Sequence, residues 1–113
     1  MNNCLFCKIA QKKIQSEIIY EDKEIAAFND INPKAPVHVL IVPKKHIASV
    51  AELEADDAIL VGKMVLVAKK IAEDKRIMDS GFRLVFNTHK NAGQLVDHIH
   101  LHLLGGKPLG PMA

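Results

Sequence analysis

The chain carries the stretch His98-Ile-His100-Leu-His102-Leu-Leu at residues 98–104, in which three histidines alternate with aliphatic residues. Because successive side chains of a strand point to opposite faces, this segment predicts an apolar face against a core and a second face with three imidazoles. Imidazole is a metal ligand, a general acid or base near neutral pH, and a nucleophile. Half of the six histidines lie here, so we expect the chemistry of the protein on this strand, which the pattern extends over residues 95–104.

The three histidines allow two functional interpretations. In the first, all three imidazoles bind a catalytic zinc ion directly. In the second, one imidazole is a nucleophile, and its neighbours orient it or assist the leaving group. Gly93 lies in a polar loop just before the strand, and backbone N–H groups of glycine-containing loops bind anions. This loop favours the second interpretation, with reaction at a phosphorus centre.

Hydrophobic periodicity and chain breakers divide the rest of the sequence into short elements. Strands outnumber helices, so the expected class is α+β with a five-stranded, mainly antiparallel sheet, one long helix and one short helix. We expect a short helix over 4–13, strands over 17–22, 24–29, 37–42 and 82–87, loops over 30–36 and 88–94, and the long helix over 56–75.

The long helix has two apolar faces. Leu60, Met64 and Val67 follow one another at helical spacing, while Val61 and Val65 lie on a second face beside them. A helix that is apolar around so much of its girth is usually covered on more than one side. In a small protein a second copy of the chain can provide this cover, so the pattern leaves a homodimer open.

Length and composition indicate one domain over residues 1–113. The net charge of +2 and the absence of Trp argue against a nucleic-acid surface. The N-terminus lacks the basic-then-apolar order of a signal peptide, and no apolar stretch approaches the ~20 residues of a membrane span. We therefore expect a soluble cytoplasmic protein that binds neither nucleic acid nor membrane.

The two cysteines, Cys4 and Cys7, have Cys-x-x-Cys spacing. In a reducing compartment this spacing indicates metal or redox chemistry more often than a structural disulfide, although two buried thiols remain an alternative. A closed tetrahedral zinc site needs two more ligands, for which His46 and one histidine of the triad are candidates. If His98 joins them, four protein ligands close the site and tie the N-terminus to the histidine strand.

As a set, these motifs resemble those of the histidine triad (HIT) superfamily, and within it the Hint branch of nucleoside phosphoramidases. The resemblance implies a HIT-like fold whose sheets join across a homodimer, and a pocket for purine nucleoside monophosphates such as AMP or GMP. It also implies an adenosine 5′-monophosphoramidase-like hydrolase that cleaves the P–N bond of purine nucleoside 5′-phosphoramidates through a nucleotidyl-histidine intermediate. Besides residues 98–104, it is carried by Cys4-Leu-Phe-Cys-Lys-Ile, Ala27-Phe-Asn-Asp-Ile-Asn-Pro, Ala35-Pro-Val-His-Val-Leu-Ile-Val-Pro-Lys-Lys-His, Ala92-Gly-Gln and Leu104-Gly-Gly.

The resemblance also implies roles for individual residues. The implied catalytic residues are His98, His100, His102 and His38. His100 would attack the phosphorus, His102 would assist the leaving group, and His38 would help set the tautomers of the triad. Asp30 would hold the ribose hydroxyls. In zinc-bearing relatives the ligands correspond to Cys4, Cys7, His46 and His98, which implies a structural zinc ion and no organic cofactor. The implied nucleotide-binding residues are Phe6, Ile9, Phe28, Asn29, Asp30, Ile31, Asn87, Gly93 and Gln94, together with His100 and His102.

Two features depart from the family pattern. Leu95 stands where many relatives have Ser or another polar residue, so a hydroxyl contact to the phosphate or leaving group, worth ~1.5–3 kcal/mol, is missing. The tail is short and ends in Pro111-Met-Ala, which affects the expected amine specificity. Two alternatives therefore stay open: a dinucleoside polyphosphate hydrolase of the same superfamily, and a non-catalytic nucleotide-binding or protein-interaction module.

Overall fold

The structure of the protein is a computed structural model that describes residues 4–12 and 17–112. Three helices flank the sheet, and they are α1 (Leu5–Ala10), α2 (Ala58–Asp74) and α3 (His89–Ala92). Two single turns of 3-10 helix, Val50–Glu52 and Ala55–Asp57, precede α2. Five strands form the sheet, and they are β1 (Ile18–Glu21), β2 (Ile25–Asn29), β3 (Val37–Pro43), β4 (Phe82–Phe86) and β5 (Leu101–Gly105).

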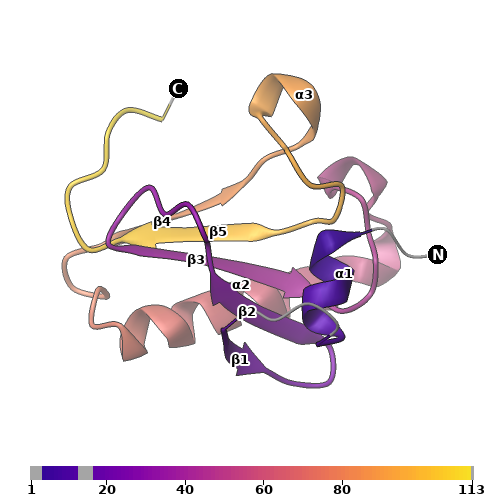
Figure 1. Ribbon diagram of the computed structural model, residues 1–113, viewed down its shortest axis with the longest axis horizontal. Coiled ribbons are helices and arrows are strands. Elements are labelled where there is room, and N and C mark those ends of the chain that lie inside the picture. The colour runs from indigo at the N-terminus through magenta and orange to yellow at the C-terminus, as the bar shows by residue number, and fades with distance from the viewer. Residues whose placement is uncertain (1–3, 13–16, 113) are drawn as a thin grey trace.

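The strands pair in the order β1-β2-β3-β5-β4, so the last strand of the sequence lies between β3 and β4 (Figure 1). Each of the four pairs is antiparallel. The α+β class and the five-stranded antiparallel sheet expected from the sequence are confirmed. Within the described part of the chain, no helix combines the length and apolar character needed to cross a membrane.

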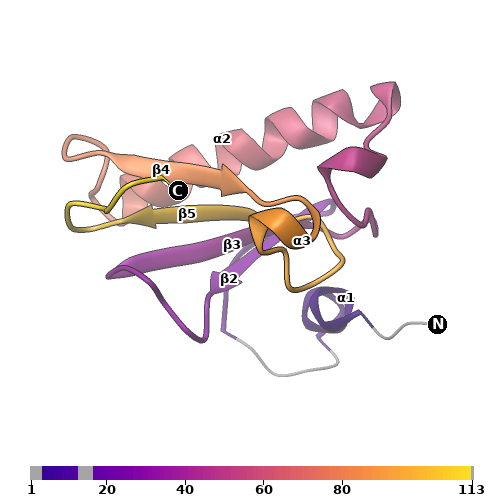
Figure 2. The same ribbon diagram turned by 90° about the horizontal axis from the view of Figure 1, so that it is seen from above.

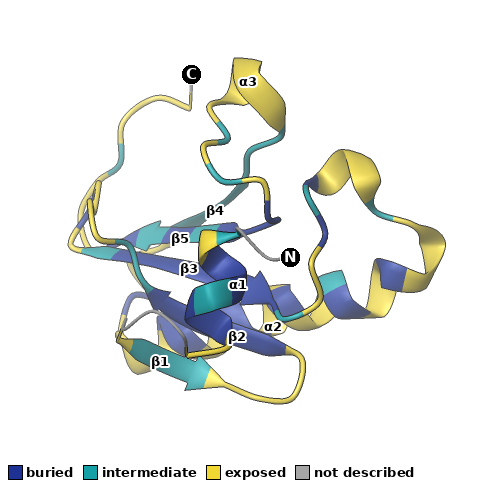
Figure 3. Cartoon of the chain, turned by 45° about the vertical axis from the view of Figure 1, so that its right-hand side comes forward, coloured by how far each residue is buried: buried dark blue, intermediate teal, exposed yellow. Residues whose placement is uncertain are grey.

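The two faces of the sheet are covered differently (Figure 2). The face against α2 holds the main core, where Ile99, Leu101 and Leu103 pack with Met64 and Ala68 of the helix. These three aliphatic residues are the ones that alternate with the histidines, so the expected apolar face of the motif is confirmed. The central strands between the helices are accordingly the most buried part of the molecule (Figure 3).

The opposite face, which carries the histidines, is covered at one end by α1. Phe6 and Ile9 of this helix form a second apolar cluster with Phe28, Leu40 and Val42 of β2 and β3. A helix of six residues has little stability of its own, so α1 depends on this packing for its position.

The histidine strand is shorter than expected. β5 begins at Leu101, whereas residues 95–100 form an irregular approach to it. The prediction of a strand over 95–104 is therefore wrong at its N-terminal half, because this approach bonds to the segment after β3 and makes no strand pairing there. One such bond runs from the Ile99 N–H to the carbonyl of Ile47 at 2.6 Å. His98 and His100 are consequently buried in the approach to the strand.

Other boundaries also differ from expectation. α2 begins at Ala58 because Glu54 and Asp57 bond reciprocally and hold a 3-10 turn before it. The loop expected over 88–94 contains the short helix α3, whose first N–H, that of His89, is bonded by the side chain of Gln94. α1 ends at Ala10, and the expected continuation to residue 13 lies partly outside the described residues.

The second apolar face of α2 is only partly covered within the chain: Val61 is half-buried and Val65 is 40% exposed. Ile59 and Leu66, seven positions apart on the outer side of the helix, are 75% and 65% exposed in the single chain. Strand β4 lies at one edge of the sheet, where its outer side has no paired strand within the described residues. The face of Leu60, Met64 and Val67 is thus in the core, whereas the face of Val61 and Val65 is covered only in part by the same chain.

Candidate functional site

His100 is held in one tautomer by the main chain. Its Nδ1 lies 2.7 Å from the carbonyl oxygen of His98. Because a carbonyl oxygen only accepts hydrogen bonds, the ring proton is on Nδ1 and the lone pair is on Nε2. Burial lowers the pKa of His100 below the ordinary value of 6.5, which keeps the ring neutral near neutral pH. The site therefore contains a neutral imidazole with an unprotonated Nε2, the form that acts as a nucleophile.

His102 is oriented through a relay of hydrogen bonds. The backbone N–H of Lys34 donates to Nδ1 of His38 at 3.0 Å, so the proton of a neutral His38 is on Nε2. This Nε2 lies 2.9 Å from Nδ1 of His102 and donates to it. The proton of a neutral His102 is consequently on Nε2. The relay thus makes the outer nitrogen of His102 a donor, opposite in role to that of His100.

Burial is the main cause of the shifted pKa values in this relay. It lowers the pKa of His102 from 6.5 to about 4, with smaller contributions from the neighbouring His100 and His38. Burial also lowers the pKa of His38, against the opposing attraction of Asp30. The rings of His100 and His102 lie side by side, with their centroids 4.9 Å apart. An acceptor nitrogen and a donor nitrogen therefore come from neighbouring rings of one site.

Asp30 lies at the end of this relay. Its Oδ2 is 3.5 Å from Nε2 of His38, and its backbone N–H donates to the carbonyl of His38 at 2.9 Å. The other carboxylate oxygen, Oδ1, accepts the N–H of Asn32 at 2.8 Å. The carboxylate is thus fixed beside the histidines and is partly exposed.

An apolar wall stands next to His100. The ring of Phe6 meets that of His100 edge to face, with centroids 4.9 Å apart and planes at 86°. Phe6 also meets the ring of Phe28 at 5.5 Å, and Ile9 is buried in the same cluster. Of the residues expected to enclose the base, Ile31 stands apart from this wall and is 87% exposed in the loop after β2.

The loop around α3 connects β4 to the approach to β5. The register pairs Phe86 with Leu101, so Asn87 leaves the sheet at the end where His100 approaches β5. Gly93 ends α3 with a φ of 81°, in the left-handed region that favours glycine. Asn87 is therefore placed at the end of the sheet where His100 lies, while Gly93 shapes the loop that leads to it.

Gln94 is engaged within the protein. Its Oε1 accepts the N–H of His89 at 2.8 Å, and its Nε2 donates to the carbonyls of Ala48 at 2.7 Å and Val96 at 3.0 Å. These bonds use both donors and the acceptor of the amide. The side chain of Gln94 thus ties the α3 loop to the segment after β3, and sequence reasoning, which grouped it with nucleotide-binding residues, did not anticipate this use.

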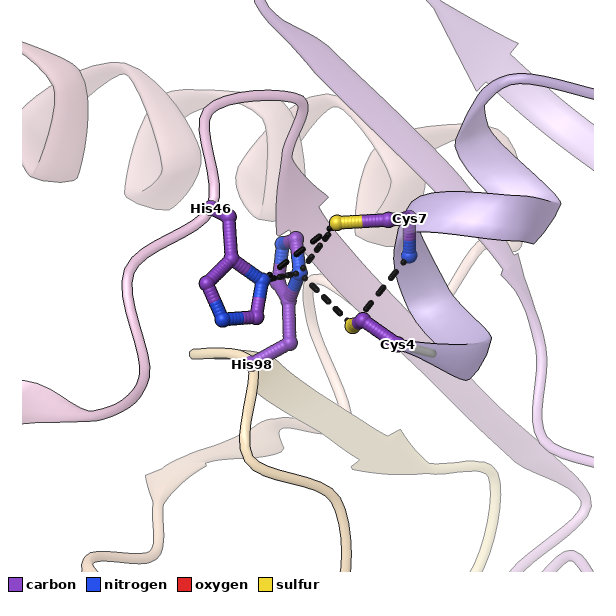
Figure 4. Close-up of side chains that lie close together, drawn as sticks. All are labelled: Cys4, Cys7, His46 and His98. Atoms are coloured by element: carbon purple, nitrogen blue, oxygen red, sulfur yellow. Dashed lines mark hydrogen bonds between the residues drawn. The ribbon is translucent and has the colours of Figure 1, made fainter. Parts of the chain in front are cut away.

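A second cluster joins Cys4, Cys7, His46 and His98, whose ligand atoms all lie within 4.8 Å of one another (Figure 4). Nδ1 of His98 lies 3.3 Å from each of the two sulfur atoms, and 3.1 Å from Nδ1 of His46. Cys7 Sγ lies 3.3 Å from Nδ1 of His46. The cluster joins α1, the segment after β3 and the approach to β5, so three distant parts of the chain converge on it.

The donor set of this cluster fits a metal ion. The Nε2–H of His98 donates to the carbonyl of Pro43 at 2.7 Å, which leaves the lone pair of Nδ1 directed at the cluster. Such outer hydrogen bonds are typical of metal-binding histidines. Burial lowers the pKa of His98 to about 4, so Nδ1 stays unprotonated. Tetrahedral zinc with bonds of ~2.0–2.3 Å separates its ligands by ~3.3–3.8 Å, close to the separations seen here.

A second group of potential ligands, Asp30, His38 and His102, also lies within 4.8 Å, but its hydrogen bonds oppose metal binding. A metal ion could bind Nε2 of His38 only if this nitrogen were unprotonated. The N–H of Lys34 donates to Nδ1 of the same ring, so the ring proton is on Nε2. The group is therefore a hydrogen-bond relay. Among the described residues the three triad histidines do not form one ligand group, which argues against the direct three-histidine zinc site.

Comparisons with known proteins agree with this geometry. Over residues 3–111 the chain matches the family model described as "Scavenger mRNA decapping enzyme C-term binding". It is 48% identical over 108 residues to the purine nucleoside phosphoramidase of Escherichia coli (strain K12), which covers 96% of this chain and 91% of that protein. The chain belongs to the histidine triad (HIT) family.

Solved structures of HIT proteins support the same assignment. A HIT family hydrolase from Legionella pneumophila Philadelphia 1 superposes with a TM-score of 0.94 at 51% identity, over 96% of each chain. A HIT family hydrolase from Clostridium thermocellum also has a TM-score of 0.94, at 49% identity over 98% of this chain and 96% of that chain. The protein is therefore a HIT family hydrolase with the fold of these relatives.

The groups of this HIT site that the sequence did not reveal are mostly main-chain atoms. The N–H of Lys34 and the carbonyls of Pro43 and His98 decide which ring nitrogens carry protons. Every residue has these groups, so no side-chain pattern distinguishes them. Their roles could be recognised only once the fold had placed them against particular rings.

Proposed function

We propose that this HIT hydrolase cleaves the P–N bond of purine nucleoside 5′-phosphoramidates through a nucleotidyl intermediate on His100. The observation that carries the proposal is the opposite tautomers of two neighbouring rings, with an unprotonated Nε2 on His100 and a relay that puts the proton of His102 on Nε2. A nucleophile beside a donor is what an attack on phosphorus with an amine leaving group requires. The name of the Escherichia coli relative, purine nucleoside phosphoramidase, supports the substrate class.

The proposed reaction has two steps. The leaving nitrogen of the substrate carries a proton taken from solvent, and the Nε2–H of the neutral His102 donates a hydrogen bond to the phosphate as the amine departs. His100 Nε2 attacks the phosphorus, the P–N bond of the substrate breaks, and a neutral amine departs with that proton. In the second step water attacks the phosphorus and releases one proton to solvent, while the bond to His100 breaks. Nucleoside monophosphate is released, His100 returns to its neutral form, and His102 stays neutral throughout.

The rest of the site would bind the nucleotide. We propose that the wall of Phe6, Ile9 and Phe28 receives the purine of AMP or GMP, since this surface is apolar and aromatic. The fixed carboxylate of Asp30 would accept hydrogen bonds from the ribose hydroxyls. In addition, the proposal keeps the remaining predicted contacts, namely those of Asn29 and Ile31 with the base and of Asn87 and Gly93 with the phosphate.

We propose that the four-ligand cluster holds structural zinc. Two sulfur and two nitrogen donors suit this ion, which would supply a closed tetrahedral crosslink between three segments. Thiols are kept reduced, and so available to a metal ion, in a reducing compartment, and on this ground we propose a cytoplasmic location. A single HIT domain over residues 1–113 is part of the same proposal.

We also propose a homodimer. The outer face of α2, with exposed Ile59 and Leu66, needs an apolar partner, and the edge of β4 offers unpaired main-chain groups. A second copy placed against both features would extend the sheet across the two subunits.

One observation favours a second candidate function. Leu95 is 94% exposed, and it offers no hydroxyl to the phosphate or the leaving group. A chain with this side chain could retain the nucleotide pocket and lack turnover, as a nucleotide-binding module.

Single-turnover hydrolysis of adenosine 5′-phosphoramidate tests the proposal. Wild type is compared with His100→Ala, and acid- and base-quenched samples are searched for nucleotide attached to protein. We expect rapid AMP release and a trapped adduct in wild type only, with AMP binding retained in the variant. A matched control is His89→Asn, since His89 is an exposed histidine with a φ of 64° that asparagine tolerates. Full activity of His100→Ala would refute the nucleophile, whereas binding without turnover in wild type would favour the nucleotide-binding module.

A further inference from the structure

Phe6 connects the cysteine–histidine cluster to the nucleophile. It lies between Cys4 and Cys7 in the sequence, on the short helix α1 that also carries the Cys7 thiol. Its buried ring meets His100 at 4.9 Å and His98 at 6.2 Å between centroids. Any shift of α1 relative to the cluster therefore moves the ring that stands against His100.

His98 provides a second connection. Its Nδ1 faces Cys4, Cys7 and His46, and its Nε2–H is bonded to Pro43. The ring is thus fixed on both sides, and its main-chain carbonyl is the acceptor that holds Nδ1–H of His100. One residue is consequently both a member of the cluster and the partner that sets the tautomer of the nucleophile.

We infer that the Cys4–Cys7–His46–His98 cluster positions the His100 ring, through the carbonyl of His98 and the side chain of Phe6. This inference rests on the proposed function, in which His100 is the nucleophile. It gives the cluster a second role, orientation of His100, besides the structural role of holding three segments together. Phe6 is then a positioning residue as well as part of the apolar wall. Because α1 is too short to be stable alone, its contact with His100 depends on the anchoring of Cys4 and Cys7 together with the apolar packing of Phe6 and Ile9.

The alternative is that the cluster stabilises the fold without acting on His100. In that case Phe6 contributes only buried apolar area. An equally disruptive substitution elsewhere in its apolar cluster would then change the His100 signals and kcat by the same amount. Val42 supplies the matched control, since it is buried in the apolar cluster of Phe6 but belongs to β3. The comparison of Phe6→Leu with Val42→Ala separates contact with His100 from loss of packing, and all four proposed ligands are retained in both variants.

The first measurement is NMR of the histidine ring nitrogens in nucleotide-free protein loaded with zinc. Long-range ¹H–¹⁵N correlation shows which nitrogen of His100 carries the proton. We expect one Nδ1–H tautomer in zinc-loaded wild type and in Val42→Ala, and shifted or mixed His100 signals in Phe6→Leu and after removal of zinc with a chelator. Unchanged His100 signals in both Phe6→Leu and the chelated protein would overturn the inference.

Kinetics provide a second measurement. A shift of a reacting group by about 1 Å costs ~100-fold in rate, so a smaller rotation of His100 in Phe6→Leu should lower kcat about tenfold beyond any change in Val42→Ala. A change confined to KM would mean that Phe6 acts on the base alone and would overturn the positioning role. The two proposals can be refuted separately. Absence of phosphoramidate hydrolysis in wild type would refute the proposed function. The NMR comparison would still decide whether the Cys4–Cys7–His46–His98 cluster positions the His100 ring.

Discussion

Replacement of His38 tests the relay that orients His102. In the structure His38 accepts the N–H of Lys34 and donates to Nδ1 of His102 at 2.9 Å. His38→Leu removes both bonds, whereas His38→Gln has an amide N–H that can still reach His102. The two variants differ in the donor to His102 and retain a side chain of similar length.

The magnitude follows from the bond that is lost. A buried group left without its partner costs ~1–3 kcal/mol; the exposed Lys34 can bond to water, so most of this cost falls on the partly buried His102. We expect the free energy of unfolding of His38→Leu to fall by about 2 kcal/mol. A tautomer preference of about 1.4 kcal/mol corresponds to a factor of ten, so kcat should fall about tenfold. His38→Gln should retain kcat within about threefold of wild type.

The assay is steady-state hydrolysis of adenosine 5′-phosphoramidate, with kcat and KM determined separately, together with urea unfolding of each variant. A kcat for His38→Leu equal to that of wild type would show that the relay does not govern turnover. Equal losses of kcat in the Leu and Gln variants would show that the shape of the imidazole matters and the donor does not. Either result would refute the reasoning from the tautomers.

Three further predictions concern the metal cluster, acid stability and assembly. Cys4→Ser combined with Cys7→Ser should lower the free energy of unfolding by about 4 kcal/mol, which is the stabilisation given by an ion present at ~1,000 times its Kd. The free-energy barrier of the chemical step should change by less than this amount. An unchanged Tm in the variant, together with no zinc in wild type by elemental analysis, would contradict the prediction. Because the folded-state pKa of His102 is lowered from 6.5 to about 4, the unfolded chain binds the proton first as pH falls. The contribution of neutral His102 to the free energy of unfolding is therefore complete above pH 6.5 and is lost between pH 6.5 and about 4, by ~2 kcal/mol at this partly exposed group. In His102→Asn, the free energy of unfolding measured in urea should depend less on pH between these two values. An identical pH dependence in wild type and variant would count against the prediction. Leu66→Glu should convert the dimer to a monomer in sedimentation velocity, because Leu66 is 65% exposed in the single chain, and a monomeric wild type would remove the basis for the interface.

Much of the fold follows from local patterns. The alternation in residues 98–104 placed Ile99, Leu101 and Leu103 on the core side, since the side-chain period of an extended chain is independent of its neighbours. The long helix and the two strands that become β1 and β2 were predicted for similar reasons. The extent of β5 was not predicted correctly, because residues 95–100 have the apolar composition of a strand but bond to the segment after β3.

The candidate site divides in the same way. The alternation of histidines and the Cys-x-x-Cys spacing identify the chemical groups, because these are properties of neighbouring residues. The sequence alone could not assign a different partner to each histidine. His98 turns to cysteines more than 90 positions away, His100 bonds to a carbonyl two residues earlier, and His102 meets a ring from β3. Protonation of an imidazole depends on the acceptor or donor within about 3 Å, and those neighbours are brought together only when the sheet and α1 have packed.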